Sequence, residues 1–587
     1  MEAFGQLSEQ DRSQAIQVLR RRLVPRDLRA VIEDLESGGR SRSRKSVEWI
    51  IAAVEHESGR ARSKLPEGEL AEFLVDRSGF GLLESRTLRE RLALSASEDE
   101  LETLHDYRGA ERSRGGSRAK AKKIAERTWK PGKSWPRHFA RVLDIPPAFA
   151  GLPGSTREPD TLEVAPFVPL RDLEDFQQDL KEQVIEVLSG APGTNRGVLT
   201  LPTGAGKTRT AVESLIEWRI SQPRRQTVLW IAQSEELCEQ AVQAFREVWT
   251  DLGHRNDQVR HTMEIARLWG SGASVPSDPD IVVASIQKLD AVLRGTNDDT
   301  QQELELLREN LGAVVVDEAH RMLAPSYNRV LRFLGIELGQ KAPVPVIGLT
   351  ATPFRRVDAE TRQLAERFHS KLLSSRSLGG DIVSELRRRD VLSRPEHKVL
   401  SYAGPGFRMD DVESHRAHFE QFKDFHPDFL RKIGESDARN RALLEQLLEL
   451  PPDCPTLFFG CTVEHSIAMA VLLRRAGRAA EVVTSNTRSA TRRALIEQFR
   501  DERLSVLCNY GVLTTGFDAP AVRALVVGRP TTSPVLYEQM IGRGMRGPRF
   551  GGTKSCLVVD IEDNIRFSGQ LAYERYSGYW SSNQSRT

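Results

Sequence analysis

The segment Leu199–Thr208 constrains the fold of this chain more than any other stretch. It reads Leu-Thr-Leu-Pro-Thr-Gly-Ala-Gly-Lys-Thr, after a short apolar run and before a segment with helical character. Glycines let the backbone curl around an anion, and the N-terminus of the next helix favours negative charge. Lys207 can then reach the β- and γ-phosphates of a nucleotide, and Thr208 can hold Mg²⁺. The strict phosphate-loop pattern has glycine where Leu201 stands, so a glycine-rich turn before a lysine is the alternative.

A second segment, Val314–His320, ends an apolar β-branched run with two adjacent carboxylates. Such a run is typical of a buried parallel strand, and ligands lie beyond the carboxyl ends of these strands. We expect Asp317 near the metal, through water, and Glu318 beside the water that attacks the γ-phosphate. A strand with a solvated acidic turn is the alternative. The phosphate loop lies about 110 residues upstream, which leaves room for several βα units and disfavours that alternative.

A third segment, Gln539–Arg546, places two arginines three residues apart. In a helix Arg543 and Arg546 would share one face. Two guanidinium groups suit the charge that spreads over a transferring phosphoryl group. An ordinary basic helix end is the alternative for this segment in isolation.

In this order the three segments resemble motifs I, II and VI of the superfamily 2 helicases and translocases of the DEAH-box kind. The similarity is greatest to RadD-type proteins and to the helicase part of type III restriction enzymes. Gly348–Phe354 resembles motif III and Leu513–Pro520 resembles motif V. Phe176-Gln177-Gln178 resembles the adenine-reading segment, although Glu174-Asp175 stands where Arg-Pro is usual. The resemblance covers about residues 165–565, roughly two thirds of the chain.

The resemblance implies an α/β fold: two RecA-like parallel-sheet lobes in tandem, with ATP between them, preceded by a mostly α-helical N-terminal domain. The first lobe would supply the residues that hold the nucleotide and Mg²⁺: Gln177, Thr203, Gly204, Ala205, Gly206, Lys207, Thr208, Asp317 and Glu318. The second would supply Gly516, Asp518, Gln539, Arg543 and Arg546. Thr350 and Thr352 would couple the nucleotide state to the nucleic acid.

We therefore expect an ATP hydrolase that uses Mg²⁺ and acts on DNA, single-stranded or duplex, as a helicase or translocase. Repair, recombination and antiviral defence against foreign DNA are the candidate roles. The alternative is a nucleic-acid-stimulated ATPase switch that clamps on its substrate and signals to a protein partner through residues 1–150. RNA stays open as a substrate. A nuclease in this chain is disfavoured, because no convincing Asp…Glu-x-Lys set for metal-dependent cleavage is found.

The charge distribution adds one expectation. The net charge is only +2, so bulk electrostatics say little about partners. From Tyr107 to Arg141, however, the sequence contains twelve lysines and arginines but only two acidic residues. Trp129 and Trp135 are interleaved with these cations. This combination predicts contact with a phosphate backbone and stacking on bases. A solvated basic helix with structural tryptophans is the alternative.

Membrane and metal signals are weak. No run of about 18 apolar residues predicts a membrane helix, and the first residues do not resemble a secretory signal. The five cysteines form no CxxC pair, which favours a reducing, cytoplasmic location. His415, His418 and His426 lack a second ligand pair, so a metal site there is disfavoured.

Periodicity and composition divide the chain into segments. We expect a helical accessory domain at 1–150, a linker at 151–164, the first lobe at 165–370, an interlobe helical segment at 371–440, the second lobe at 441–565 and a tail at 566–587. Ser8–Asp11 is a plausible cap for the first helix. The stripe of Phe419, Phe422, Phe425 and Phe429 predicts packing rather than a stacking surface.

Overall fold

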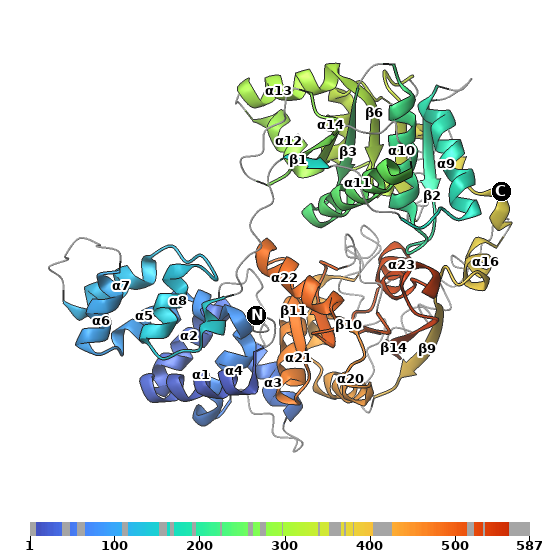
Figure 1. The fold of residues 1–587 in the computed structure, drawn as a ribbon. Coiled ribbons are helices and arrows are strands. Elements are labelled where there is room, and N and C mark those ends of the chain that lie inside the picture. The colour runs from blue at the N-terminus through green and yellow to red at the C-terminus, as the bar shows by residue number, and fades with distance from the viewer. Residues whose placement is uncertain are drawn as a thin grey trace.

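The computed structural model shows a helical N-terminal domain and two α/β lobes (Figure 1). It describes residues 7–37, 47–55, 65–107, 116–151, 161–164, 170–190, 195–223, 226–255, 262–270, 278–295, 298–337, 341–351, 366–368, 371–379, 381–402, 425–513, 522–531 and 534–562. Within these ranges we find no helix with the length and apolar content needed to span a lipid bilayer.

The N-terminal domain consists of short helices, as the sequence predicted. Helix α1 (Glu9–Arg22) begins at Ser8, whose side chain accepts a hydrogen bond from the backbone N–H of Asp11. This confirms the predicted cap. The remaining helices are α2 (Pro25–Ser37), α3 (Val47–Glu55), α4 (Leu70–Ser78), α5 (Arg86–Leu94), α6 (Glu98–His105), α7 (Ser117–Glu126) and α8 (Ser134–Val142), with 3-10 turns at Glu67–Glu69, Gly79–Glu84 and Pro147–Ala150.

The first lobe is built on an eight-stranded sheet with the order β1-β4-β5-β3-β6-β7-β2-β8. Every pair in it is parallel except β1 with β4. The strands are β1 (Thr161–Val164), β2 (Arg196–Thr200), β3 (Thr227–Ala232), β4 (Met263–Leu268), β5 (Ile281–Ser285), β6 (Leu311–Val316), β7 (Val346–Thr350) and β8 (Leu372–Leu373). The helices are α9 (Asp175–Leu188), α10 (Lys207–Ser221), α11 (Glu235–Arg255), α12 (Ile286–Arg294), α13 (Asp298–Glu309) and α14 (Pro325–Phe333), with a 3-10 turn at Ala319–Arg321.

Burial explains why the central strands are continuous apolar runs. All residues of β3, β5, β6 and β7 are buried. Side chains of one face pack with α9, α10 and α11, and those of the other pack with α12, α13 and α14. A parallel sheet covered on both faces needs apolar residues at every position rather than at alternate ones.

The second lobe is a six-stranded, all-parallel sheet with the order β11-β12-β10-β13-β14-β9. Its strands are β9 (Arg394–Leu400), β10 (Thr456–Phe459), β11 (Ala480–Val483), β12 (Val506–Asn509), β13 (Ala524–Val527) and β14 (Ser555–Ile561). Helices α16 (Ile382–Arg388), α19 (Pro427–Gly434), α20 (Asp437–Glu449), α21 (Val463–Arg475), α22 (Ser489–Arg500) and α23 (Pro534–Ile541) accompany it, with 3-10 turns at Arg376–Leu378, Gly542–Gly544 and Pro548–Phe550.

Two segment assignments need correction. The expected linker 151–164 contains β1, which pairs antiparallel with β4 at the edge of the first sheet. The expected interlobe helical segment 371–440 contains β8, which pairs with β2, and β9, which pairs with β14. Strand β9 was missed because it is an edge strand whose mostly exposed residues, Arg-Pro-Glu-His-Lys-Val-Leu, carry little apolar signal.

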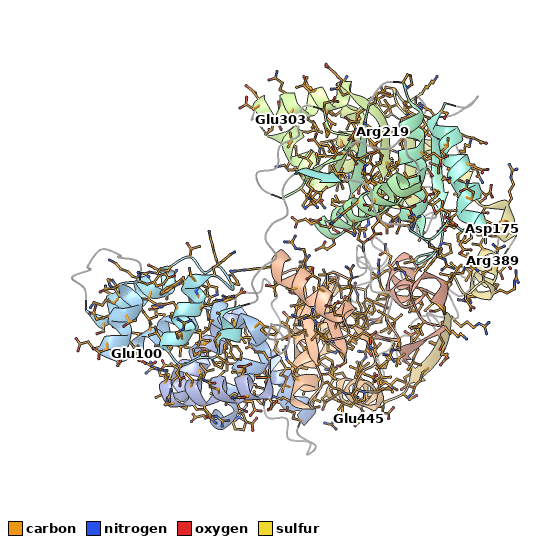
Figure 2. The ribbon with its side chains drawn as sticks, viewed as in Figure 1. Glu100, Asp175, Arg219, Glu303, Arg389 and Glu445 are labelled. Atoms are coloured by element: carbon orange, nitrogen blue, oxygen red, sulfur yellow. The ribbon has the colours of Figure 1, made fainter. Side chains whose placement is uncertain are left out.

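The segment that connects β8 of the first sheet to β9 of the second contains α16 and contacts the first lobe. Arg389 follows this helix and forms an ion pair with Asp175 at the start of α9, and Figure 2 shows the two side chains next to each other. Arg389 also pairs with Glu385 in α16 itself. The segment that leaves the first sheet therefore stays attached to it until β9 begins.

The N-terminal domain is packed on the second lobe. Helices α3 and α4 lie against α21 (Figure 1), and three α21 residues belong to the apolar core of the N-terminal domain: Ala468, Val471 and Leu472. Arg475 of α21 contacts Glu55 at 2.7 Å and Asp76 at 3.2 Å. Shared apolar burial together with ion pairs makes these two parts of the chain one packed unit.

The aromatic residues singled out in the sequence are packing residues. Trp129 and Trp135 are each only 8% exposed. Arg89 lies over the ring of Trp129 at 4.6 Å, and Arg127 lies over that of Trp135 at 4.7 Å. The predicted stacking of these tryptophans on bases is therefore wrong, whereas the predicted contact of this segment with a phosphate backbone stays a prediction. Two further residues of the stripe, Phe425 and Phe429, pack in a small cluster, while 419 and 422 lie outside the described residues.

Candidate active site

The loop after β2 has the geometry of a phosphate cradle. Gly204 and Gly206 have φ angles of 90° and 83°, a region that favours glycine, and α10 begins at Lys207 directly afterwards. The N–H groups of the first helical turn therefore face the loop. Leu201, which breaks the strict pattern, is only 1% exposed and packs in the core, so this departure serves the fold.

The acidic pair lies at the carboxyl end of β6, as predicted. Asp317 is 4% exposed, and its Oδ1 accepts a hydrogen bond of 2.9 Å from the backbone N–H of Glu318. Glu318 adopts the left-handed conformation, with φ and ψ both 50°. This backbone costs energy in a residue other than glycine and is typical of functional sites.

His320 connects the acidic pair to the next strand. Its Nδ1 lies 3.2 Å from Oε2 of Glu318 and 3.2 Å from the hydroxyl of Thr350. Thr350 ends β7 and is fully buried. A displacement of the Glu318 carboxylate would therefore shift the imidazole and change its contact with Thr350 at the end of β7. This arrangement suits the coupling role predicted for Thr350.

The surroundings separate the pKa values of the two carboxyls. Burial, followed by the adjacent charge of Glu318, raises the pKa of Asp317. Burial also acts to raise the pKa of Glu318. The hydrogen bond and charge of His320, together with the charges of Lys207 and Arg543, outweigh it and hold that pKa below its ordinary value. Glu318 is thus an ionised carboxylate that can accept a proton.

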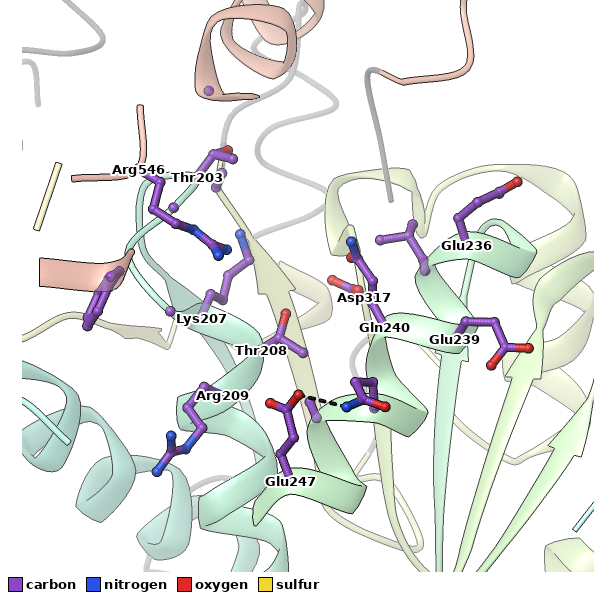
Figure 3. A pocket seen from close by; sticks show the side chains of 18 of the residues that line it. Thr203, Lys207, Thr208, Arg209, Glu236, Glu239, Gln240, Glu247, Asp317 and Arg546 are labelled. Carbon is purple, nitrogen blue, oxygen red and sulfur yellow. Dashed lines mark hydrogen bonds between the residues drawn. The ribbon is translucent and has the colours of Figure 1, made fainter. Parts of the chain in front are cut away.

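The second lobe brings its arginine segment onto the phosphate loop. A Cβ added to Gly542 would lie 2.7 Å from Cβ of Thr203, and one added to Gly204 would lie 3.4 Å from Cα of Arg546. Arg543 lies in a 3-10 turn and Arg546 follows it, so the arginines do not share one α-helical face as the spacing suggested. They reach the loop because the turn itself abuts it, and Figure 3 shows Arg546 beside Lys207.

Gln539 has a buried polar atom that a bound phosphate could satisfy. Its side chain is 8% exposed, and its Nε2 is buried without a hydrogen-bond partner among the described residues. Leaving a buried donor unsatisfied costs about 1–3 kcal/mol, so such an atom usually has a partner. The amide lines the same cavity as the phosphate loop, where an oxygen of a bound phosphate can satisfy it.

A cavity of about 930 Å³ joins these elements (Figure 3). This is a volume suited to a nucleotide-sized ligand. Predicted residues that line it are Gln177, Thr203, Gly204, Gly206, Lys207, Thr208, Asp317, Glu318, Gln539, Arg543 and Arg546. Sequence reasoning missed other lining residues, which include Arg171, Glu236, Gln240, Glu538 and Phe550.

Glu538 is the missed residue with the most chemical interest. Burial raises its pKa to about 8, with Lys207 lowering it and the charge of Glu318 raising it further. Its position directly before the predicted segment Gln539–Arg546 was the available signal. Phe550 offered no such signal, since nothing in its neighbours marks it as a cavity residue.

Two family models match the lobes in the expected order. Residues 171–355 match the type III restriction enzyme res subunit, and residues 439–548 match the helicase conserved C-terminal domain. Both matches include the residues that face each other across the cavity. The chain belongs to the superfamily 2 helicases. It is related within them to the helicase parts of restriction enzymes.

Individual relatives of this helicase agree with the assignment. It is 28% identical over 382 residues to irc3 of Schizosaccharomyces pombe, whose name describes an ATP-dependent helicase of mitochondria; the match covers 64% of this chain and 55% of irc3. It is 26% identical over 413 residues to the EcoKI type I restriction endonuclease subunit of Escherichia coli, covering 63% of this chain and 33% of that one. This helicase therefore spans about half or less of the length of these curated relatives.

Among solved structures, a fragment of a type I restriction enzyme HsdR subunit from Vibrio vulnificus aligns with a TM-score of 0.45 and 18% identity. The alignment covers 68% of this helicase and 65% of that chain.

Not every predicted site residue of this helicase can be located. Gly516, Asp518 and Thr352 lie outside the described residues. Gln177 lines the cavity, but its amide donates to the carbonyl of Ala205 at 3.2 Å and accepts from the backbone N–H of Glu174 at 3.0 Å. Both ends of this amide thus hold local structure, and the adenine-reading role of Gln177 stays a prediction.

Proposed function

We propose that this chain is an ATP hydrolase of the DEAH-box kind that couples hydrolysis to movement on DNA as a translocase or helicase. One observation carries the proposal: the phosphate loop of the first lobe and the arginine segment of the second line the same cavity, which the unsatisfied amide of Gln539 also lines. Catalysis of phosphoryl transfer is mostly positioning and electrostatic stabilisation, which such a two-sided pocket supplies.

The residues fit a nucleotide with Mg²⁺. The glycine loop and the start of α10 would hold the phosphates, with Lys207 at the β- and γ-positions. Thr208 and Asp317 would hold Mg²⁺, which when bound neutralises phosphate charge. Glu318 would take a proton from the attacking water at its carboxylate, which His320 orients at 3.2 Å.

Because the two arginines come from the second lobe, the rate of ATP hydrolysis should depend on closure of the lobes. Arg543 and Arg546 belong to the second lobe, so they meet the transferring phosphoryl group only while the turn at Gly542 abuts Thr203. Loss of one arginine of this kind costs about 10³–10⁵ in rate in related chemistry. Nucleotide turnover and relative movement of the lobes are thereby linked.

DNA is the proposed substrate because the matching family model and one relative are named for restriction enzymes, and the name of that relative describes an endonuclease subunit. A role in DNA repair or in defence against foreign DNA follows from the same support, and we propose a cytoplasmic location. A clamp-like switch without processive unwinding would use the same ATP site. The experiment must therefore distinguish this switch from a helicase or translocase.

The decisive experiment measures ATP hydrolysis with single-stranded DNA, duplex DNA, forked DNA and RNA in parallel, at one stated salt concentration, together with strand displacement. We expect DNA to stimulate turnover and Lys207→Ala to abolish it. Lys341→Ala, which changes an exposed lysine outside the cavity, is the matched control and should hydrolyse ATP normally. Stimulation by RNA alone would refute the DNA assignment, and turnover in Lys207→Ala would refute the site. Hydrolysis on DNA without displacement or movement would favour the switch.

A further inference from the structure

The N-terminal domain carries an exposed cationic surface on α7, α8 and the turn between them. Between residues 116 and 151 there are nine lysines and arginines and two acids. Seven of these cations are exposed: Arg118, Lys122, Lys123, Lys130, Lys133, Arg137 and Arg141. We call these seven residues the cationic face.

The members of the cationic face form no ion pairs within the part of the chain that the structure describes. The two acids of the segment are engaged elsewhere, because Glu126 binds Arg86 and Asp144 binds Arg21. Like charges four residues apart along one helix, such as Arg118 and Lys122, repel one another, so the fold gains nothing from this arrangement. A polyanionic ligand would relieve the repulsion.

The other cations of the segment show the contrast. Lys120 pairs with Glu102, and Arg127 lies on Trp135 and donates to the carbonyl of His105 at 2.6 Å. These two serve the fold. On α8 the exposed members follow a strict spacing: Lys133 at its N-cap, then Arg137 and Arg141, each four residues on. They form one stripe with a rise of about 6 Å between neighbours.

The chemistry of the cationic face favours a duplex over a single strand. Single-strand binding surfaces combine positive charge with aromatic rings on which bases stack. Here the indole and phenyl rings of the segment are buried: Trp129 and Trp135 are 8% exposed, and Phe139 and Phe149 are fully buried. The ring of His138 is half-buried and lies against Tyr107, with 4.6 Å between the ring centroids. The face therefore offers charge to phosphates and no exposed tryptophan or phenylalanine ring to bases, which is the character of sequence-independent backbone binding.

The placement of the domain makes such binding useful to the helicase core. The N-terminal domain shares apolar packing with α21 and is held by the contacts of Arg475 to Glu55 and Asp76. In Figure 1, α3 and α4 lie against the second lobe, while α6 and α7 lie at the far end of the domain. A ligand on the cationic face is thus carried with the second lobe whenever that lobe moves.

We propose that the cationic face of α7 and α8 binds the phosphate backbone of duplex DNA, without reading sequence, and anchors the second lobe to the duplex. This rests on the proposed function for its biological use, but the binding itself does not depend on ATP hydrolysis. The occupant is identified by its chemistry alone: a regular, dense array of phosphates.

The test is a triple variant of the α8 stripe, Lys133→Gln, Arg137→Gln and Arg141→Gln. Glutamine keeps helix propensity, and the three side chains are exposed, so folding should be preserved. The matched control removes the same charge from ion-paired surface cations: Arg388→Gln, Lys398→Gln and Arg503→Gln. Circular dichroism and ATP hydrolysis without DNA are measured on all three proteins.

The readout is the binding of labelled duplex and single-stranded oligonucleotides by fluorescence anisotropy from 50 to 300 mM salt. Each phosphate contact contributes about 0.9 to the log–log salt slope, which corresponds to roughly tenfold in affinity between about 1 M and 0.1 M salt. We expect the triple variant to lose about 100- to 1,000-fold in duplex affinity at 0.1 M salt and about 2–3 in slope, with a smaller loss for single strands. The control variant should bind as the unaltered protein does.

Three outcomes would refute part or all of the proposal that the cationic face binds duplex DNA. Unchanged duplex affinity and slope in a folded triple variant would refute the cationic face as a DNA site. An equal loss for single strands would refute the duplex assignment. Binding of an acidic polypeptide such as polyglutamate more tightly than duplex DNA would refute nucleic acid as the occupant. A protein that binds duplex through this stripe yet hydrolyses no ATP would leave the inference standing and refute the proposed function instead.

Discussion

Removing the carboxylate of Asp76 tests whether the N-terminal domain and the second lobe are one packed unit. The side chain is 1% exposed and lies between two arginines from different parts of the chain. Nε and Nη2 of Arg12 contact it at 2.6 and 2.9 Å, and Nε of Arg475 contacts it at 3.2 Å. The hydrogen bond from Arg12 raises the pKa of that guanidinium above its ordinary value.

The expected cost follows from the partners that remain. Breaking a buried ion pair costs about 3–5 kcal/mol because a charge is left uncompensated. Arg12 keeps Glu72 at 2.7 Å and Arg475 keeps Glu55 at 2.7 Å, which reduces the loss. We expect Asp76→Ala to lower the free energy of unfolding by about 3 kcal/mol, near the lower end of that range.

Urea unfolding followed by tryptophan fluorescence measures the free energy of unfolding, since Trp129 and Trp135 are buried in the N-terminal domain. The matched control is Asp144→Asn, whose ion pair with Arg21 has both side chains 62% exposed. Asparagine also tolerates the left-handed backbone at this position, where φ is 62°. That substitution should cost less than about 1 kcal/mol. Adding Arg475→Ala to Asp76→Ala should cost less than the sum of the two single changes, because the residues share one contact. Equal effects of Asp76→Ala and Asp144→Asn would refute the reasoning.

Three further predictions concern other parts of the molecule. Gly542→Val should push the arginine turn off Thr203 and lower ATP turnover by about 10²-fold with an unchanged circular dichroism spectrum; normal turnover would show that this contact is dispensable. Burial lowers the pKa of His465 to about 3, so the folded state keeps it neutral while the unfolded state protonates below about 6.5. Stability present above pH 6.5 should therefore fall by about 2 kcal/mol on going to pH 5, with a shallower dependence in His465→Gln, as urea titrations at both pH values would show. Burial raises the pKa of the Cys508 and Cys556 thiols, so iodoacetamide at pH 8 should label them only after unfolding, and rapid labelling of the folded protein would contradict their placement.

Local sequence predicted where the segments of the site lie, while the chemical roles of their residues stay predictions. The glycine loop precedes α10, and Asp317 and Glu318 follow β6, because a loop or a strand end is shaped mainly by adjacent residues. The arginine segment forms a 3-10 turn in place of the helical face that its spacing suggested. The predicted cap at Ser8 is confirmed for the same reason. Strand β9 was missed because its pairing with β14 joins residues about 160 positions apart, and its own residues carry no strand pattern.

By itself the sequence determined the class of fold and the groups that can handle a phosphoryl transfer, since these follow from residue type, spacing and periodicity. Only the tertiary structure decided that Trp129 and Trp135 are packing residues, that Gln539 holds an unsatisfied amide in the cavity, and that the N-terminal domain is packed on α21. Those outcomes depend on which distant segments meet. Burial and contact across hundreds of residues are properties of the packed chain, and no short stretch of sequence contains them.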